Sequence, residues 1–259
     1  MRRNFLAGSA ATAALALMAP EAAAQPSPLN VIASGALEHV LRELAAALIA
    51  AGGPPVAFVI GNAGDVSRRI RAGEPADLII NTAAEVEAVA RDGLVDGATR
   101  ALIGTSRLGL GVGANAPLPD IATPEALRAT LLAAPTVAVP DPQAGGAAGL
   151  HLQRMFEQLD VAEALRPPRV QYYRQGRLGT QAVAEGRAAL AMTQISEIVA
   201  VSGVVLVGPL PEAVQLLTPY VGAVAARAQN RDGALLLLRQ LTGPDAAARL
   251  RAVGFTPGG

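Results

Sequence analysis

The feature that most constrains the fold is an order of segments that recurs along the chain. A short apolar segment is followed by a turn of small residues, and then by a segment whose apolar residues have helical spacing. The first three apolar segments are Leu29–Ser34, Val56–Ile60 and Leu78–Ile80, and the segments that follow them are 37–51, 65–72 and 83–91. Strands that alternate with helices pair in parallel, because each helix carries the chain back to the start of the next strand. The sequence therefore predicts an α/β fold.

A second α/β unit is predicted after a proline-containing loop at residues 115–119, which neither a helix nor a central strand would tolerate. Thr123 is expected to cap the first helix of this unit, with Pro124 at its first position. The expected helices are 124–132, 147–159, 180–184, 232–241 and 244–253, and the expected strands are 108–112, 136–139, 170–173, 189–193, 204–207 and a long buried strand at 216–226. This order predicts two lobes.

The N-terminus has the order of a secretory signal peptide, expected at residues 1–24. Arg2 and Arg3 precede an uncharged run to Pro20, and Ala24 ends a small-residue cleavage site. The paired arginines favour the twin-arginine route to the periplasm. The chain has no cysteine, so neither a disulfide nor a lipid anchor on cysteine is expected.

Charge argues against nucleic acid as a partner. The chain contains no lysine and no basic run, and removal of residues 1–24 leaves 19 basic and 20 acidic residues, a net charge of −1. His39 and His151 have no acidic or cysteine partner at ligand spacing, so neither a metal site nor a cofactor is expected.

Three loops between a strand and a helix consist of small residues and indicate a site for an anion. They are Ser34-Gly35-Ala36, Asn62-Ala63-Gly64 and Gly145-Gly146-Ala147. The first turn of a helix has unpaired N–H groups at the positive end of the helix dipole, and small residues let an anion approach them. Each loop taken singly is explained equally well as a compact turn, and the set of three favours a site.

Two arginines add candidate donors. Arg174 and Arg177 follow a predicted strand, where a guanidinium can hold a carboxylate through two hydrogen bonds. The alternative for each is a solvated loop arginine. Asp65 is expected to cap its helix rather than to contact a ligand.

Several segments resemble the molybdate-binding protein family, the periplasmic components of ABC importers with the type II binding-protein fold. They are Ala72-Gly73-Glu74-Pro75-Ala76-Asp77-Leu78, Asp141-Pro142 with Ala147-Ala148-Gly149, and Gly243-Pro244-Asp245 through Gly254-Phe255. The resemblance implies two lobes, each a mostly parallel sheet flanked by helices, joined by two crossover strands near Arg107 and Thr218. The first lobe would comprise residues 25–106 and 219–259, the second residues 107–218, and the partner would be a membrane permease.

This chain departs from the family at the ligand. The two family serines that grip the oxyanion correspond to Ala36 and Ala63, unless Ser34 serves instead, and the family tyrosine corresponds to Gln194. A metal oxyanion would lose much of its hydrogen bonding. The planar donors of Gln194 and of Arg174 or Arg177 suit an organic di- or tricarboxylate better than molybdate.

Residues 194–198 and 203–211 also resemble a branch of these proteins that includes periplasmic aconitate isomerases. That resemblance implies an enzyme with a positioned acid or base, for which the candidates are Ser196, Glu197, His39 and Tyr220. The structural alternative is that Ser196 caps a short helix and Glu197 faces water. Solute binding is the favoured function, with the isomerase as the alternative.

Overall fold

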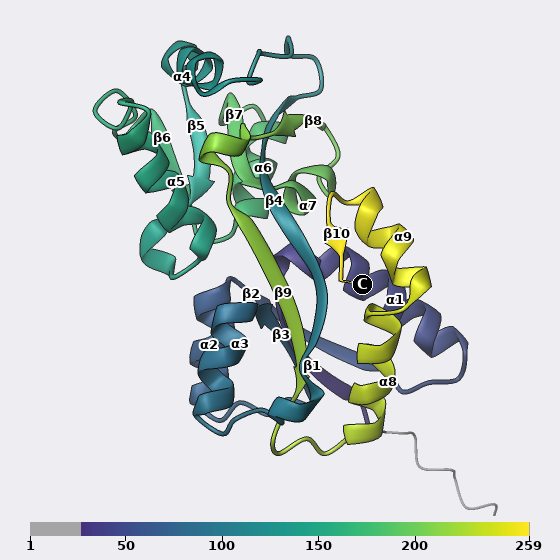
Figure 1. The fold of residues 1–259 in the computed structure, drawn as a ribbon. Coiled ribbons are helices and arrows are strands. Elements are labelled where there is room, and N and C mark those ends of the chain that lie inside the picture. Colours follow the sequence, from purple (N-terminus) through teal and green to yellow (C-terminus); the bar gives the residue numbers. More distant parts are fainter. Residues whose placement is uncertain (1–26, 259) are drawn as a thin grey trace, which may run out of the picture.

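The computed structural model describes residues 27–258, and Figure 1 shows them as two lobes joined by two long strands. Each lobe has a central β-sheet with helices on both of its faces, which confirms the expected α/β class. The predicted signal peptide, residues 1–24, lies outside the described residues. Within residues 27–258, no helix has both the length and the hydropathy needed to cross a membrane.

The sheet of the first lobe is built on three parallel strands in the order β2, β1, β3. Strand β9 runs antiparallel to β3, β4 runs antiparallel to β9, and the short β10 pairs with β4. The strands are β1 (Leu29–Ser34), β2 (Val56–Gly61), β3 (Leu78–Thr82), β4 (Ala101–Gly113), β9 (Leu217–Val224) and β10 (Thr256–Pro257).

Five helices cover the two faces of this sheet. Successive residues of β1 point to opposite faces. Val31 therefore packs with α1, α8 and α9, while Ile32 packs with α2 and α3. The helices are α1 (Glu38–Ala50), α2 (Ala63–Arg71), α3 (Ala83–Arg91), α8 (Arg231–Leu241) and α9 (Pro244–Ala252), with 3-10 turns η1 (Gly35–Leu37) and η2 (Gly97–Thr99).

Strands β4 and β9 connect the lobes. They pair with Ala101 opposite Gly222 and Ser106 opposite Thr218, and from Leu108 onward β4 pairs with strands of the second lobe instead. One strand thus belongs to both sheets, and the crossover lies where the resemblance placed it, near Arg107 and Thr218. The lobe boundaries at single-residue precision stay predictions.

The second lobe repeats the architecture. Strands β6, β5 and β7 are parallel, while β4 is antiparallel to both β7 and β8. The additional elements are β5 (Val137–Pro140), β6 (Val170–Tyr173), β7 (Leu190–Gln194), β8 (Val204–Pro209), α4 (Pro124–Ala133), α5 (Ala147–Gln158), α6 (Gly176–Ala184), α7 (Ile195–Val199), η3 (Pro142–Ala144) and η4 (Glu212–Val214).

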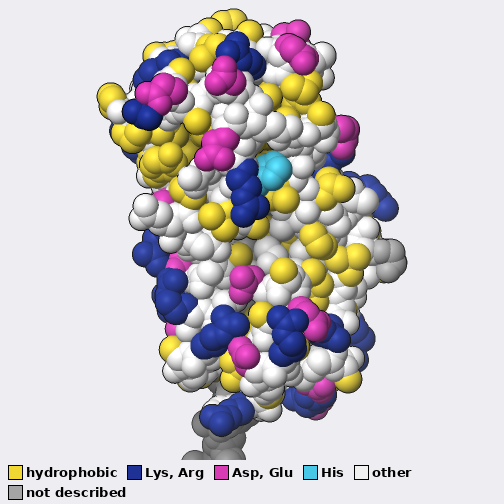
Figure 2. All heavy atoms as spheres, turned by 60° about the vertical axis from the view of Figure 1, so that its left-hand side comes forward, with side chains coloured by type: hydrophobic (Ala, Val, Ile, Leu, Met, Phe, Trp, Pro, Cys, Tyr) yellow, Lys and Arg dark blue, Asp and Glu magenta, His cyan; other side chains and the backbone are white. Residues whose placement is uncertain are grey.

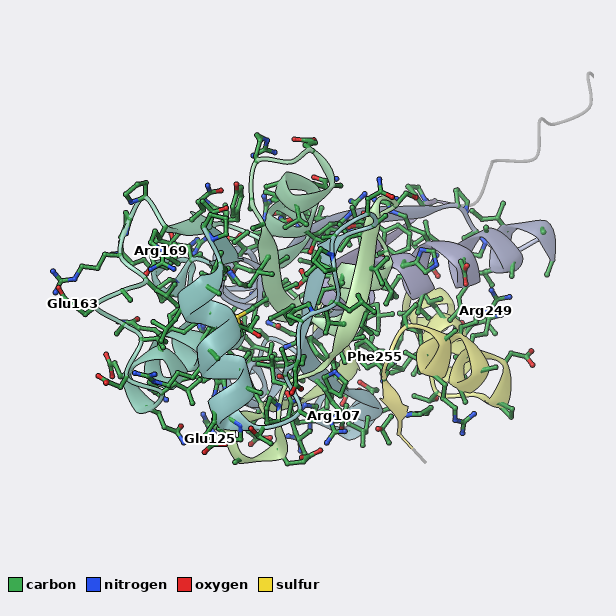
Figure 3. All side chains as sticks on the ribbon, turned by 90° about the horizontal axis from the view of Figure 1, so that it is seen from above. Arg107, Glu125, Glu163, Arg169, Arg249 and Phe255 are labelled. Carbon is green, nitrogen blue, oxygen red and sulfur yellow. The ribbon has the colours of Figure 1, made fainter. Side chains whose placement is uncertain are left out.

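One arginine fastens the outer loop of this lobe. The guanidinium of Arg169 donates hydrogen bonds to the carbonyls of Ala164, Leu132 and Ala134, at 3.0, 2.9 and 2.7 Å. Figure 3 shows Arg169 in this loop region, close to α4. The contact satisfies backbone acceptors at the end of α4 that the helix itself leaves unpaired.

Three expectations from the sequence need correction. Strand β4 has 13 residues, not the five expected, because its glycines hide the apolar pattern. Those glycines are required by packing: a Cβ on Gly109 or Gly111 would lie 2.8 or 2.7 Å from side-chain atoms of α7. Helix α6 begins at Gly176 rather than at Thr180. The cap of α2 is Asn62, whose Oδ1 accepts the N–H of Asp65 at 2.8 Å.

Candidate functional site

A cavity lies between the lobes, at the carboxyl ends of the strands, where open α/β sheets bind ligands. It is lined by residues 34–36, 61–63, 140–141, 146–148 and 174–176, together with Thr82, Gln194, Glu197, Thr218 and Tyr220. We call this space the interlobe cavity.

The first lobe contributes the starts of two helices. Residues Ser34 and Ala36 lie where β1 passes through η1 into α1, and Asn62 and Ala63 lie where β2 passes into α2. Ala36 and Ala63 are buried in the wall. The strand-to-helix loops predicted from the sequence therefore meet at one cavity.

The second lobe contributes the starts of α5 and α6. Their N-cap residues are Gly146 and Gln175, and neither makes a side-chain capping hydrogen bond. The first N–H groups of α5 are consequently left without the usual side-chain acceptor, whereas in the first turn of α6 the N–H of Arg177 donates to the carboxyl of Glu197. Gly176 is required here, because a Cβ at this position would lie 1.8 Å from Oγ1 of Thr193.

The lobes touch beside the cavity. A Cβ on Gly64 would lie 3.0 Å from the carbonyl oxygen of Ala144 and 3.1 Å from Cα of Gly145 in the opposite lobe. Nδ2 of Asn62 donates to the carbonyl of Arg174 at 3.2 Å. Two loops predicted to bind an anion thus also form a contact between the lobes.

An ion pair joins the lobes at the same place. Arg174 donates from Nε to Oδ2 of Asp65 at 3.1 Å and also pairs through Nη2 with Oδ1. Burial of Asp65 opposes its ionisation, but hydrogen bonds and positive charge from Arg174 and then Arg68 outweigh burial and lower the pKa of Asp65. Arg174 therefore lines the cavity while bound to a carboxylate of the other lobe.

Polar side chains form the floor of the cavity. Nε2 of Gln194 donates to Oγ1 of Thr218 at 3.1 Å, whereas Oε1 of Gln194 is buried and has no hydrogen-bond partner among the described residues. A buried amide oxygen without a partner costs about 1 to 3 kcal/mol, which a ligand can recover. Because Thr218 can both donate and accept, the amide can also turn and present its NH₂ group to the cavity.

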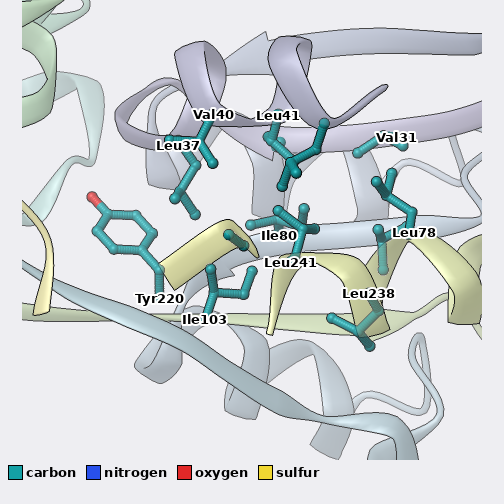
Figure 4. Close-up of a cluster of buried hydrophobic side chains, with 14 of the residues drawn as sticks. Val31, Leu37, Val40, Leu41, Leu78, Ile80, Ile103, Tyr220, Leu238 and Leu241 are labelled. Atoms are coloured by element: carbon teal, nitrogen blue, oxygen red, sulfur yellow. The ribbon is translucent and has the colours of Figure 1, made fainter. Parts of the chain in front are cut away.

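Tyr220 combines a core role with a polar end. Figure 4 shows its ring at the edge of the aliphatic cluster, with the hydroxyl pointing away from Leu37 and Ile103. The ring also packs edge-on against Phe255, with centroids 5.6 Å apart. Burial raises the pKa of the phenol, the charge of Glu197 raises it further, and a hydrogen bond with Ser34 opposes both. The phenol is therefore a neutral donor at the cavity.

Glu197 is a buried acid in the cavity wall rather than a residue facing water. Its Oε2 accepts a hydrogen bond of 2.5 Å from the hydroxyl of Thr193. Burial raises the pKa of the Glu197 carboxyl, while hydrogen bonds from Thr193 and from the backbone of Arg177 and Gln194 partly offset this effect.

A second space lies behind Glu197, and we call it the rear pocket. It is lined by residues 35–36, 38–39 and 196–197, with Arg42, Arg177 and Ala200. Three candidates from the sequence, His39, Arg177 and Ser196, line this pocket and not the interlobe cavity. Ser196 lies inside α7 and does not cap it, since the cap position is Gln194.

Arg177 was expected to hold a ligand carboxylate, but its Nη1 lies 3.5 Å from Oε2 of Glu38. Helix α6 begins one turn earlier than expected, which directs this residue to the rear of Glu197. His151 is also structural, with Nε2 2.8 Å from the carbonyl of Val214.

Sequence reasoning missed several residues of the lining: Thr82, Asp141, Gln175, Gly176 and Thr218. Thr82 is the last residue of β3 and Asp141 follows β5, and each caps the next helix or turn, as Asn62 does after β2. Thr218 comes from a crossover strand, and no local pattern distinguishes it.

Comparison with known proteins gives the chain its relatives. Residues 29–256 match the family described as bacterial extracellular solute-binding protein. The chain is 31% identical over 247 residues to an aconitate isomerase of a Pseudomonas species, an alignment covering 92% of this chain and 91% of that protein.

Two solved structures are similar in fold. The periplasmic molybdate-binding protein of Azotobacter vinelandii has a TM-score of 0.73 at 18% identity, covering 88% of this chain and 98% of its own. A sulfate-binding protein of Mycobacterium tuberculosis H37Rv has a TM-score of 0.63 at 20% identity, covering 89% and 86%. These likenesses confirm the expected two-lobed type II periplasmic binding-protein fold.

Proposed function

Because the chain belongs to the family of bacterial extracellular solute-binding proteins, we propose that it binds a small organic acid with two or three carboxylates in the interlobe cavity. The observation that carries this proposal is the convergence of helix starts on one space. Helix α5 begins there without a side-chain cap, opposite the starts of α1 and α2, and α6 begins beside it with the N–H of Arg177 donating to Glu197. Unpaired N–H groups at the positive ends of helices favour negatively charged groups of a ligand.

The chemistry of the wall favours an organic acid over a tetrahedral oxyanion. Methyl groups of Ala36 and Ala63 occupy the wall where hydroxyls would serve molybdate, and the planar amide of Gln194 faces the cavity floor. A flat carboxylate can pair with such an amide and with backbone N–H groups.

A thermal-shift screen tests the proposal. The panel contains tricarballylate, citrate, cis-aconitate and trans-aconitate, with molybdate and sulfate for comparison. A ligand at about 100 times its Kd stabilises a protein by about 2.7 kcal/mol, which for a chain of this size raises Tm by roughly 5 to 10 °C. We expect such a shift with at least one tricarboxylate and a smaller one with either oxyanion; a larger shift with molybdate would refute the proposal.

The proposed cellular setting follows from the family and the N-terminus. We propose export to the periplasm by the twin-arginine route, cleavage after Ala24, and delivery of the ligand to an ABC permease. Mass spectrometry of periplasmic protein tests the first two steps, with a mature N-terminus at Gln25 expected. An intact N-terminus would contradict them.

A second candidate function is isomerisation of an unsaturated tricarboxylate, which Glu197 specifically favours. It is a buried carboxyl in the wall of the cavity. Its pKa is raised, so the pH at which its acid and base forms interconvert lies closer to neutrality. A relative 31% identical over most of the chain is an aconitate isomerase.

Glu197 alone can supply both the base and the acid that this isomerisation needs. The carboxylate form removes a proton from the methylene carbon, the C–H electron pair forms the new C=C π bond, and the π electrons of the original double bond move onto its far carbon. The acid form then returns the proton to the far end of the allylic system.

Nuclear magnetic resonance of trans-aconitate incubated with the protein tests this candidate. We expect cis-aconitate to appear and Glu197→Gln to abolish its formation while still binding tricarballylate. Binding of trans-aconitate without any conversion would exclude the isomerase and would retain only the solute-binding function.

A further inference from the structure

Glu197 separates two spaces that have different surroundings. Its carboxyl lines the interlobe cavity on one side and the rear pocket on the other. The residues that cover it come from both lobes: a Cβ on Gly35 of the first lobe would lie 3.6 Å from Oε1, and one on Gly176 of the second would lie 2.3 Å from Oε2. Closure of the lobes is therefore what encloses this carboxyl.

No cation among the described residues pairs with Glu197. Nη1 of Arg177, from α6, lies 3.5 Å from Oε2 of Glu38. Nη2 of Arg42, from α1, lies 2.9 Å from Oε1 of the same residue. His39, on the same helix, is exposed and lies 3.3 Å from Glu43. The contacts to the carboxyl are a hydroxyl of Thr193 and backbone N–H groups.

The remaining neighbours of Glu197 also disfavour its charge. Glu38 is a like charge, and the Tyr220 phenol from β9 is neutral. A ligand with several carboxylates in the adjoining cavity would add further negative charge. An ionised carboxyl enclosed without a cation and next to a bound anion is strongly unfavourable, whereas the neutral acid can donate its O–H to that anion.

The other carboxyl of the cavity wall differs in these respects. Asp141 is half-buried, and its Oδ1 accepts the backbone N–H of Gln143 at 2.8 Å, as the cap of η3. Its charge is thus stabilised by a helical cap and by solvent. Of these two carboxyls of the cavity wall, Glu197 is the one that is fully enclosed, and no cation among the described residues pairs with it.

We infer that Glu197 takes up one proton when the lobes close on a polycarboxylate, and that its neutral carboxyl then donates a hydrogen bond to the ligand. The rear pocket supplies the route for this proton, since it reaches Glu197 from the side that the ligand does not occupy. The hydroxyl of Ser196, which lines that pocket, is buried and without a hydrogen-bond partner among residues 27–258, so it is free to take part in the transfer. This inference rests on the proposed function, because it requires an anionic ligand in the interlobe cavity.

The sign of the pH dependence follows from linkage. Burial raises the pKa of Glu197 above its ordinary value of 4.5, and closure of the lobes completes this burial. The proton on Glu197 therefore contributes fully to the free energy of ligand binding below the ordinary pKa. This contribution is lost as the pH rises through the raised pKa of the closed state. Between the two values, one proton per ligand makes Kd rise by about tenfold per pH unit.

Isothermal titration calorimetry of the full mature chain with tricarballylate tests the inference. This probe has no double bond, so it cannot be isomerised during the titration. Measurement at a series of pH values, in buffers with different ionisation enthalpies, gives the number of protons taken up per ligand, and for the natural protein we expect the largest value, approaching one, between the ordinary value of 4.5 and the raised pKa of the closed state.

Variants assign the proton to its residue. Glu197→Gln keeps the shape and a hydrogen-bond donor, so it should bind tricarballylate with little proton uptake and a nearly constant Kd across the pH range. Any proton taken up by the ligand itself remains in this variant and can be subtracted. In Asp141→Asn, which removes the other wall carboxyl and keeps the cap, the uptake should persist.

The outcomes separate the two hypotheses. Binding by the natural protein without proton uptake would overturn this inference and leave the proposed function intact, as would equal uptake in Glu197→Gln. No binding heat with tricarballylate, cis-aconitate or trans-aconitate would overturn both.

Discussion

Replacement of Gly64 by alanine should weaken ligand binding without weakening the fold. The new Cβ would lie 3.0 Å from the carbonyl oxygen of Ala144, and 3.1 Å from both Cα and the carbonyl oxygen of Gly145. Contacts this short are tighter than almost all contacts of real Cβ atoms, so the opposing atoms must give by a few tenths of an ångström. The opposing atoms are backbone, so the lobes themselves must move apart.

The size of the effect can be estimated from this contact. Overpacking by one methyl group costs about 1 to 3 kcal/mol, which corresponds to a loss of affinity of roughly 5- to 150-fold if the cost applies only to the closed state. Gly64 lies in α2, where alanine stabilises a helix by about 0.5 to 1 kcal/mol relative to glycine. The Tm of the ligand-free protein should therefore stay the same or rise.

Two assays on tricarballylate complexes check this prediction. Calorimetry gives Kd, and small-angle scattering gives the radius of gyration with and without ligand, which should decrease less in Gly64→Ala than in the natural protein. Gly113→Ala is a matched control, since a Cβ at Gly113 meets nothing within 4 Å. Unchanged affinity and full compaction in Gly64→Ala would refute the assignment of this contact to closure.

Three further predictions follow from the same contacts. Arg174→Ala should weaken the binding of tricarballylate more than Arg177→Ala does, because Arg174 lines the interlobe cavity and Arg177 lines the rear pocket; calorimetry on both variants measures this difference, and equal losses would contradict it. The pKa of Asp65 is lowered in the folded protein, so ionised Asp65 stabilises the fold above its ordinary pKa of 3.8, and this stabilisation is lost as the pH falls through the lowered pKa. In this acid range, the Tm of the natural protein should therefore decrease more than the Tm of Arg174→Ala. Parallel curves of Tm against pH would contradict the ion pair. Gly176→Ala should lower the free energy of unfolding by about 3 kcal/mol or more, because its Cβ would lie 1.8 Å from Oγ1 of Thr193. Urea unfolding measures this free energy, and an unchanged midpoint would contradict the close packing of Gly176 against Thr193.

The sequence predicted the elements that depend on local patterns. The strand-to-helix loops at Gly35 and Asn62 are predictable because their whole signal, apolar spacing and small residues at a helix start, lies within about ten consecutive residues. Both loops line the interlobe cavity. Glycine-rich β4 was underestimated, because its backbone packs directly against α7 and no side-chain pattern records that contact.

The contacts that define the site join residues far apart in the chain. Arg174 binds Asp65 across 109 positions, and neither residue carries a local signal for the other. Figure 2 shows basic and acidic side chains interspersed on one face of the molecule. The burial of Glu197 depends on glycines of η1 and α6, which sequence alone assigns to turns.

A crystal structure with tricarballylate bound tests the central claim most directly. We predict electron density for the ligand in the interlobe cavity, with one carboxylate within hydrogen-bond distance of the Gln194 amide and another at the N–H groups that begin α5. Contacts from both lobes are essential to this prediction. A ligand bound elsewhere, or held by the loops of one lobe alone, would contradict it.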